Sequence, residues 1–332
     1  MVKCFIGWLL CVCGSLLSPP MVSAQAADAK GDALVNEVRK EYPPALQRLE
    51  TVYSHMRIVG TAADRFPSLE SEYVYGVEVL VSEDSIRLVQ TRAAPAVKTV
   101  GNTWTYVWKP GLAFWLERKR DAREFAIRSL EAGPGRSDSL FRAVEHKTQL
   151  CFAPFSIGVV RLSALVNSPA FKIRDVSWVE RAEENLLNVV FDAESKLGIR
   201  RTGSILVDPT HAWVIREWRE TRHLQPIPTD GHGVIEYDGQ YKGVPLLSRA
   251  EVTWAAGEPS ETREFYELVV EDIRREDIGP EEFTLAAFGV SEAGGARPSS
   301  LPPIFTWSLI VATIAFALVL LWRARNRRTP SE

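Results

Sequence analysis

The sequence has few cysteines, four in 332 residues. Three of them lie within the first 13 residues, in an apolar segment that we expect to be removed on export. The mature chain would then keep Cys151 alone and could form no internal disulfide, so its stability must come from a packed core. Because Leu150 and Phe152 flank Cys151, we interpret it as a small buried side chain and not as a nucleophile.

Recognisable catalytic and metal-binding motifs are also missing. His211, His223 and His232 are twelve and nine residues apart, which is not the spacing of metal ligands on one element. Turn residues lie beside each of them, and Asp230-Gly231-His232-Gly233 itself predicts a turn, so we expect solvated loop histidines. No serine lies in a Gly-x-Ser-x-Gly elbow. We therefore predict no enzyme, no catalytic residue, no metal site and no cofactor; a hydrolase is the third alternative.

Basic residues are in the minority. The chain has 39 lysines and arginines against 42 acidic residues, a formal net charge of −3. The charges of the two terminal segments are mostly basic, so the body of the chain is more acidic than this total. Such a surface repels a phosphate backbone, and nucleic acid is therefore not an expected partner.

The N-terminus has the composition of a secretory signal peptide. Lys3 precedes an apolar core over residues 4–17, and two prolines and the small-residue sequence Ala24-Gln25-Ala26 follow. The core is shorter than the ~20 residues of a spanning helix, which disfavours an uncleaved anchor. The residues before its cysteines are too bulky for lipid attachment. We predict a signal peptide over residues 1–26.

Residues 304–322 form a second, longer apolar stretch without a charged residue. At about 1.5 Å per helical residue, this length matches the ~30 Å hydrocarbon thickness of a bilayer. Trp307 and Trp322 lie near its ends, and the four arginines of the tail, residues 323–332, place the C-terminus in the cytoplasm. A buried core helix is the alternative. We predict a single-pass protein of the bacterial cytoplasmic (inner) membrane with an extracytoplasmic body.

Between these ends we expect one domain over residues 27–288, followed by a linker over residues 289–303 that is rich in Gly, Pro and Ser. Helical spacing of apolar residues predicts helices over residues 32–40 and 44–56, as one helix or a kinked pair. Alternating apolar residues predict strands elsewhere. Two more helices are expected, one between Ser137 and Pro154 and one over residues 156–166, and strands at residues 73–82, 86–91, 103–108, 112–118, 171–180, 186–193, 200–207, 212–219, 233–241, 247–255 and 262–273.

This order of elements predicts a mainly β, α+β fold. At least ten strands joined by short turns form one antiparallel system, and the helices are available to cover one of its faces. We therefore expect a strongly curved antiparallel sheet, a half-barrel with helices in its concavity, in preference to a closed barrel. One C-terminal transmembrane helix completes the prediction.

The aromatic residues of the strands are the main candidates for function. Trp104, Tyr106 and Trp108 alternate and must share one face of a strand. They could fill a core, as tryptophan often does, or line an apolar cavity that accepts a chain-like ligand. The segment 156–166, bounded by prolines, is then the expected lid.

The arrangement resembles the periplasmic outer-membrane lipoprotein-sorting (LolA-like) half-barrel family over residues 30–288. The resemblance lies in the order of elements, the turn Leu206-Val207-Asp208-Pro209 and the aromatic strand around Trp213. The ending Glu282–Gly289, the linker and the single helix are similar to uncharacterised membrane-anchored bacterial proteins. The resemblance implies a groove that binds or senses lipid or lipoprotein acyl chains. A tether departs from a diffusing carrier and suits sensing, docking or transfer at one membrane.

The sequence thus predicts a membrane-tethered domain that binds or senses an apolar ligand, a lipid or lipoprotein acyl chain, without catalysis. The alternative is an envelope protein-interaction or scaffold module with a filled core, whose partner would be another envelope protein. The candidate groove residues are Trp104, Tyr106, Trp108, Phe114, Trp115, Ile157, Val160 and Leu162.

Overall fold

The computed structural model describes the body of the chain between its two apolar ends. The predicted signal peptide up to residue 21, most of the linker, the predicted span 304–322 and the basic tail lie outside the described residues. Within the described part, no helix is long and apolar enough to cross a membrane. The described residues are 22–67, 71–94, 101–133, 140, 144, 146–181, 184–194, 198–223, 227–256 and 262–290.

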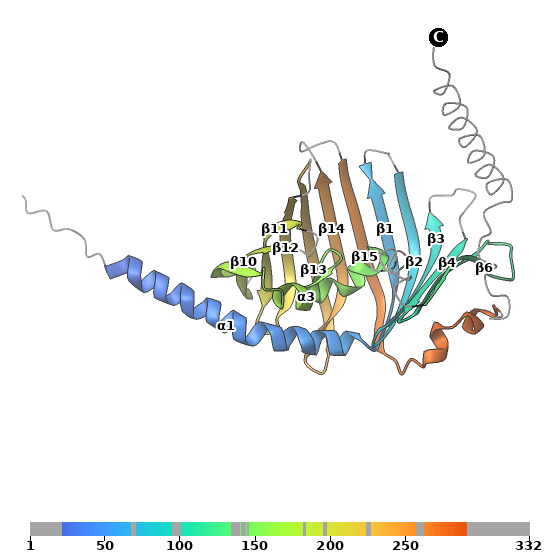
Figure 1. Ribbon diagram of the computed structural model, residues 1–332, viewed down its shortest axis with the longest axis horizontal. Helices are drawn as coiled ribbons and strands as arrows, with labels where there is room; N and C mark the ends of the chain where they lie inside the picture. The colour runs from blue at the N-terminus through green and yellow to red at the C-terminus, as the bar shows by residue number, and fades with distance from the viewer. Residues whose placement is uncertain are drawn as a thin grey trace, which may run out of the picture.

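Thirteen strands of the described residues form one antiparallel, curved sheet (Figure 1). Its order is β6-β5-β4-β3-β2-β1-β15-β14-β13-β12-β11-β10-β9, so the first and last strands of the chain pair in the middle and join two wings. This confirms the predicted antiparallel architecture. The strands are β1 (Met56–Phe66), β2 (Ser71–Ser82), β3 (Ser85–Ala94), β4 (Thr103–Lys109), β5 (Leu112–Arg118), β6 (Ala126–Ala132), β9 (Lys172–Arg181), β10 (Glu184–Glu194), β11 (Arg200–Asp208), β12 (Val214–His223), β13 (Thr229–Tyr241), β14 (Val244–Ala256) and β15 (Thr262–Arg275).

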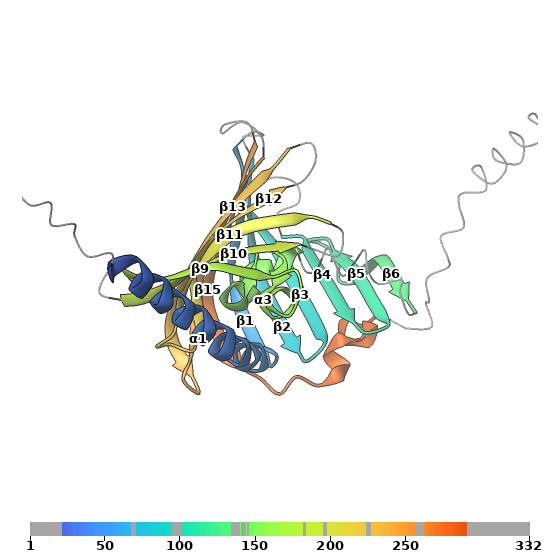
Figure 2. The same ribbon diagram turned by 60° about the vertical axis from the view of Figure 1, so that its left-hand side comes forward.

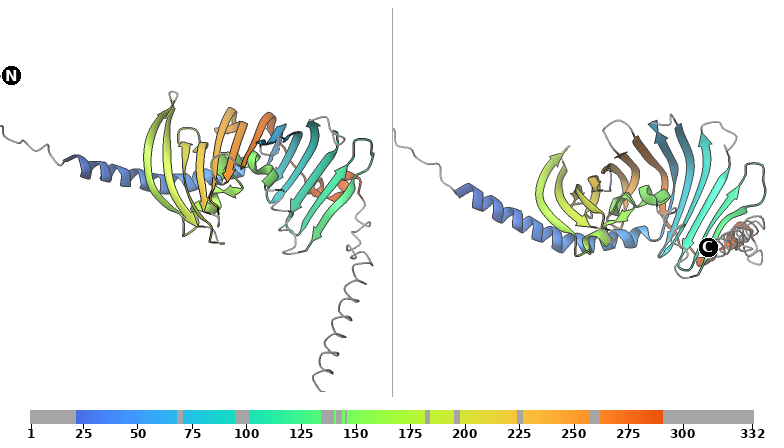
Figure 3. Two further views of the ribbon diagram at one scale, coloured as in Figure 1. Left: turned by 90° about the horizontal axis from the view of Figure 1, so that it is seen from above. Right: turned by 45° about the horizontal axis from the view of Figure 1, so that its top comes forward.

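The inner face of the sheet is covered by α1 (Val22–Tyr53) and by the segment that connects the wings. Figures 2 and 3 show the sheet bending around this segment, with α3 (Leu162–Val166) inside the curve. The helical spacing predicts that Leu46, Leu49 and Val52 are buried; Leu46 and Leu49 are fully buried in the core, and Val52 is partly buried against it. At the end of α1, the Tyr53 hydroxyl accepts a 2.9 Å hydrogen bond from the Leu247 amide and so fixes the helix to β14.

The connecting segment corrects one prediction. Residues 149–155 form the 3-10 helix η2, which continues through Pro154 instead of ending before it. The predicted helix over 156–166 is a tight hairpin, β7 (Ser156–Ile157) and β8 (Val160–Arg161), before α3 begins. Gly158 adopts a φ of 55°, a left-handed conformation that glycine adopts readily and that allows the hairpin to turn.

Two strands of the thirteen-stranded sheet were not predicted. β1 begins at Met56, where the sequence predicted the end of a helix, and β6 was left unassigned. Small residues of low strand propensity hide β1 in the sequence. One of them, Gly60, is required by the structure, because a side chain there would overlap the Val269 carbonyl at a bulge in the pairing with β15.

The outer face of the β2–β5 wing is covered by the end of the described chain. The 3-10 helices η3 (Pro280–Phe283) and η4 (Leu285–Phe288) pack there over a second apolar cluster. Phe283 is 1% exposed and Arg87 forms an ion pair with Glu282 beside it. We call η3 and η4 together the strap. The strap holds the C-terminal end of the described chain on the face opposite α1.

Candidate functional site

The inner face of β4 and β5 carries the aromatic row that the sequence predicted. Trp104, Tyr106 and Trp108 all pack against the main core from one side of β4. The register pairs Tyr106 with Trp115 of β5, and their rings stack at 5.6 Å with an interplanar angle of 13°. Trp104 in turn meets the edge of Tyr75 on β2 at 6.3 Å.

Phe114 does not belong to this row. It pairs with Val107 and is fully buried in the second cluster, beneath the strap on the outer face. Its inclusion among the groove residues was therefore wrong. Neighbouring positions of a strand point to opposite faces, and the adjacent bulky pair Phe114-Trp115 does not reveal which of the two faces inward.

One predicted pair does meet at a cavity, the Trp108 pocket. Trp108 and Val160 line a volume of about 410 Å³ between β4, the β2–β3 turn and the β7–β8 hairpin. Its rim is charged, because Glu83, Asp84 and Arg161 also line it. Ile157 and Leu162, the other predicted lid residues, are fully buried in the core, so a ligand could reach them only after the hairpin moves.

Ionisable groups also border the aromatic row. The Lys147 ammonium lies 5.2 Å from the centre of the Tyr106 ring, and the His146 ring lies 5.7 Å from that of Tyr266. Burial raises the pKa of Asp64 and lowers the pKa of Lys147, and the Lys147 charge partly opposes the rise at Asp64. This part of the inner face is therefore amphipathic, and less suited to an apolar chain than a fully apolar pocket.

A pocket lined mainly by apolar residues lies between α1 and strands β9–β11, and we call it the α1 pocket. Its volume is about 230 Å³, and its lining residues are apolar except for Arg39 and Tyr42. Phe171 stacks on Phe191 beside it at 5.6 Å, which fixes one wall. The lining residues are Val38, Arg39, Tyr42, Pro43, Val166, Phe171, Ile173, Val189 and Ile205.

Two polar groups mark the α1 pocket, both on one turn of α1. The Tyr42 side chain is 2% exposed, and its hydroxyl has no hydrogen-bond partner among the described residues. Burial raises the pKa of Tyr42, so the hydroxyl stays neutral and keeps its proton to donate. Arg39 lines the same pocket and is exposed to solvent. This pair was not predicted, because helical spacing alone indicates only that α1 is an amphipathic helix.

The inner face also contains a buried ion triad. Glu220 is fully buried and accepts hydrogen bonds from Arg201 at 2.6 Å and Arg222 at 2.8 Å. The Arg222 guanidinium lies 3.8 Å from the centre of the Trp254 ring. Both acceptor oxygens of Glu220 are occupied, so the triad serves structure and offers no free carboxylate for acid–base chemistry.

The described residues contain no group of three or more His, Cys, Asp or Glu side chains arranged to hold a metal ion. Cys151 is buried, and burial raises the pKa of its thiol to about 12. At neutral pH the thiol is therefore protonated and a poor nucleophile. This placement confirms its interpretation as a core residue.

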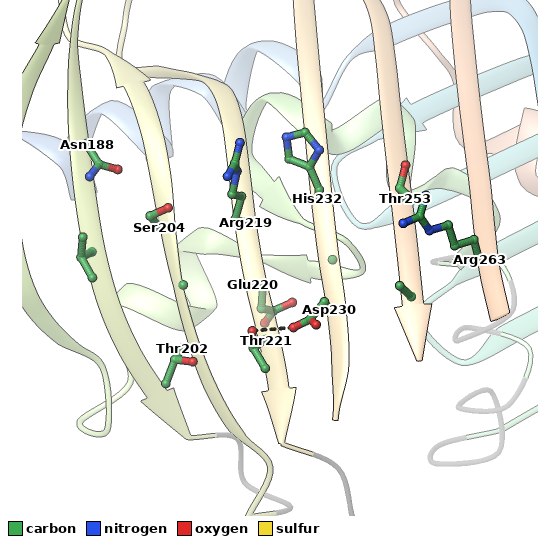
Figure 4. A pocket seen from close by; sticks show the side chains of 14 residues that line it. Asn188, Thr202, Ser204, Arg219, Glu220, Thr221, Asp230, His232, Thr253 and Arg263 are labelled. Atoms are coloured by element: carbon green, nitrogen blue, oxygen red, sulfur yellow. Dashed lines mark hydrogen bonds between the residues drawn. The ribbon is translucent and has the colours of Figure 1, made fainter. Parts of the chain in front are cut away.

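The outer face of β10–β15 holds a further cavity of about 840 Å³, the outer groove (Figure 4). Its side chains are mostly small and polar, and Arg219 and His232 project into it from neighbouring strands. His232 was expected in a turn. It lies within β13 instead, where its Nε2 is 2.9 Å from Glu217.

No protein-family model matches the chain, and no curated protein matches it in sequence. Solved structures that resemble it include a putative outer membrane lipoprotein-sorting protein domain from Vibrio parahaemolyticus, at 9% identity and a TM-score of 0.44, covering 73% of this chain and 96% of that one. A DUF1329 family protein from Desulfovibrio piger has 10% identity and a TM-score of 0.43, with 74% and 97% covered. A LolA superfamily protein from Nitrosomonas europaea has 10% identity and a TM-score of 0.35, with 70% and 90% covered. The family that the sequence resembles is thus also found among these structures.

Proposed function

We propose that this domain binds the apolar chain of a lipid or lipoprotein in the α1 pocket, and that it acts without catalysis. The observation that carries the proposal is the α1 pocket, a cavity with mainly apolar lining residues, one of which is Tyr42, whose buried hydroxyl has no hydrogen-bond partner among the described residues. An unsatisfied buried hydroxyl is costly, and a polar atom of a bound ligand would remove that cost. Arg39 at the same pocket suits an anionic head group, such as a carboxylate or a phosphate.

The shape of the site supports a narrow ligand. The α1 pocket is smaller than the usual ~300–1,000 Å³ of drug-sized sites, so it suits one chain better than a bulky molecule. Its walls come from a helix and from a wing of the sheet, so a small shift of α1 would widen it. The Trp108 pocket, with its charged rim, is the second place where part of such a ligand could lie.

The lipid proposal is tested by Tyr42→Phe, with Tyr53→Phe as the matched control. Loss of the Tyr42 hydroxyl breaks no hydrogen bond with the described residues, so stability should stay within about 0.5 kcal/mol, while fatty-acid affinity should fall about three- to tenfold. Tyr53→Phe loses a hydrogen bond to the backbone and should cost about 1 kcal/mol without changing affinity. Urea unfolding and titration with a fluorescent fatty acid measure both effects.

The same purified protein also tests the leading alternative, a scaffold module with a filled core. Organic extraction of the purified chain, followed by mass spectrometry, should yield lipid from the wild type. An extract without lipid, combined with equal fatty-acid affinity in wild type and Tyr42→Phe, would contradict the proposal. The scaffold function would then be preferred.

A filled-core interaction module is the second candidate. It is favoured by the complete burial of Ile157 and Leu162, which the sequence placed in a groove and which instead fill the concavity. In that case the inner face serves only stability, and partners bind elsewhere on the domain.

The membrane tether is part of the proposal. The uncharged stretch 304–322 and the arginines that follow it support a single span with the C-terminus in the cytoplasm. Protease added to spheroplasts should therefore degrade the folded domain, while a tag placed after Glu332 stays protected. A tag that is digested together with the domain would contradict this topology.

A further inference from the structure

The outer groove differs from the rest of the outer face in its side chains. Elsewhere on the outer face, long charged side chains form ion pairs across the strands. Arg57 pairs with Glu78 at 3.1 Å, and Arg249 pairs with Glu267 at 2.6 Å. In the groove the register places Ser204, Arg219, His232 and Thr253 in one row across four adjacent strands. Figure 4 shows these side chains pointing to the same side of the sheet. The groove is thus a row of mostly short hydrogen-bonding groups between ion-paired surfaces.

One end of the groove carries an excess of positive charge. The Glu217 carboxylate, whose side chain is 7% exposed, bonds to Arg181, to Arg219 at 3.1 Å and to His232 at 2.9 Å. The single negative charge of Glu217 therefore balances only one of the two positive charges of Arg181 and Arg219. The Arg219 side chain is 71% exposed. These hydrogen bonds lower the pKa of Glu217 although its burial acts to raise it. The buried carboxylate holds the cationic groups in place at the surface.

The remaining features of the groove limit what can bind there. β12 and β13 are paired on both edges, so a ligand cannot add a strand and must be recognised by side chains. Among the described residues that line the outer groove there is no Phe, Tyr or Trp ring on which a sugar could stack. Its lining is polar instead. Asn188 offers an amide donor and acceptor, and the Thr221 hydroxyl donates to Asp230 at 2.6 Å, which leaves the other Asp230 oxygen as an acceptor for a peptide N–H.

We propose that the outer groove binds an extended, acidic segment of a partner polypeptide, with a carboxylate on Arg219. The lining residues span strands β10 to β15, and six strands at about 4.8 Å spacing give a path of roughly 24 Å. An extended peptide covers this path with about seven residues. A second cavity of about 320 Å³, which shares Asn188, Ser204 and Arg219, continues the path to Arg181 on the edge strand β9. The site is on the face opposite the α1 pocket, so a lipid and a peptide could be bound together.

The test uses the full chain in detergent and three labelled heptapeptides, one rich in Glu and Asp, one with Lys at the same positions and one with Gln. Fluorescence anisotropy should show saturable binding of the acidic peptide alone, weakening as salt increases. Arg219→Gln should weaken this binding about tenfold, because a charge-assisted hydrogen bond is lost. Thr253→Trp should weaken it by blocking the groove, without any change of charge.

Matched controls separate the groove from general charge and from folding. Arg274→Gln removes an arginine of similar exposure on β15, outside the groove, and should leave binding unchanged. Tyr42→Phe should also leave it unchanged, so the peptide and lipid proposals can fail separately. Circular dichroism verifies that each variant is folded. Equal binding of all three peptides, equal binding by Arg219→Gln and wild type, or binding only of phosphate or a uronic-acid oligosaccharide would overturn the proposal.

Discussion

Glu220→Ala should lower the free energy of unfolding by about 3 to 5 kcal/mol, the cost typical of removing one partner from a buried ion cluster. The carboxylate is 0% exposed, and its two partners, Arg201 and Arg222, have side chains only 9% and 17% exposed. Its loss leaves two guanidinium charges close together without a counter-charge. Burial and the Arg201 charge already lower the pKa of Arg222, and the Glu220 charge opposes that effect.

Urea unfolding of the wild type and the variant measures this effect. Glu251→Ala is the control, because Glu251 pairs with Arg249 on the half-exposed outer face and should cost less than about 1 kcal/mol. If Glu220→Ala also cost less than about 1 kcal/mol, water would have to reach both guanidinium groups, and the inner face would be more open than its packing indicates.

The strands could be predicted because the alternation of side chains along a strand is a local feature of the sequence. Over most of β10 and β14 the side chains alternate between a buried and a less buried face, and this period of two is visible in the sequence. β1 was missed because Gly60 and its small neighbours have low strand propensity, and Gly60 is required by close contact with β15. Its partner lies about 200 residues away in the chain, so no local pattern could reveal the pair that joins the two wings.

The same contrast between local patterns and long-range contacts applies to the candidate sites. The aromatic row of β4 was visible because it lies within one strand. The α1 pocket combines Tyr42 of α1 with Val189 and Ile205 of the sheet, and the outer groove combines side chains of six strands. Both depend on register and on helix placement, which composition and periodicity do not determine.

Asp230-Gly231-His232-Gly233 shows most clearly how a local rule can fail. Asp230-Gly231 predicted a turn before a strand that begins at Gly233, yet all four residues lie within β13. Each glycine faces the core, where the Trp254 ring lies against Gly231 and the Trp218 ring against Gly233. The rings are 5.5 Å apart and occupy the space that two side chains of β13 would take. The glycines are therefore explained by close packing of the backbone.

Trp218→Ala and Gly233→Ala should consequently be strongly coupled. Trp218 is 1% exposed, so its truncation should cost about 3 to 5 kcal/mol. A methyl group at Gly233 would overlap the same ring, and this overpacking should cost about 1 to 3 kcal/mol. In the double variant the added methyl group enters the space that the ring has left. The total cost should fall below the sum of the two single costs by at least about 1 kcal/mol.

Gly76→Ala provides the control for this cycle. Gly76 lies in β2, where the nearest atom to an added methyl group is the Thr91 carbonyl oxygen at 3.9 Å, so the substitution meets no clash. It should leave stability unchanged or raise it slightly, since alanine restricts the unfolded chain. Combined with Trp218→Ala, it should be additive within about 0.5 kcal/mol. Additivity of Gly233→Ala with Trp218→Ala in the same urea measurements would mean that the ring does not rest on this glycine.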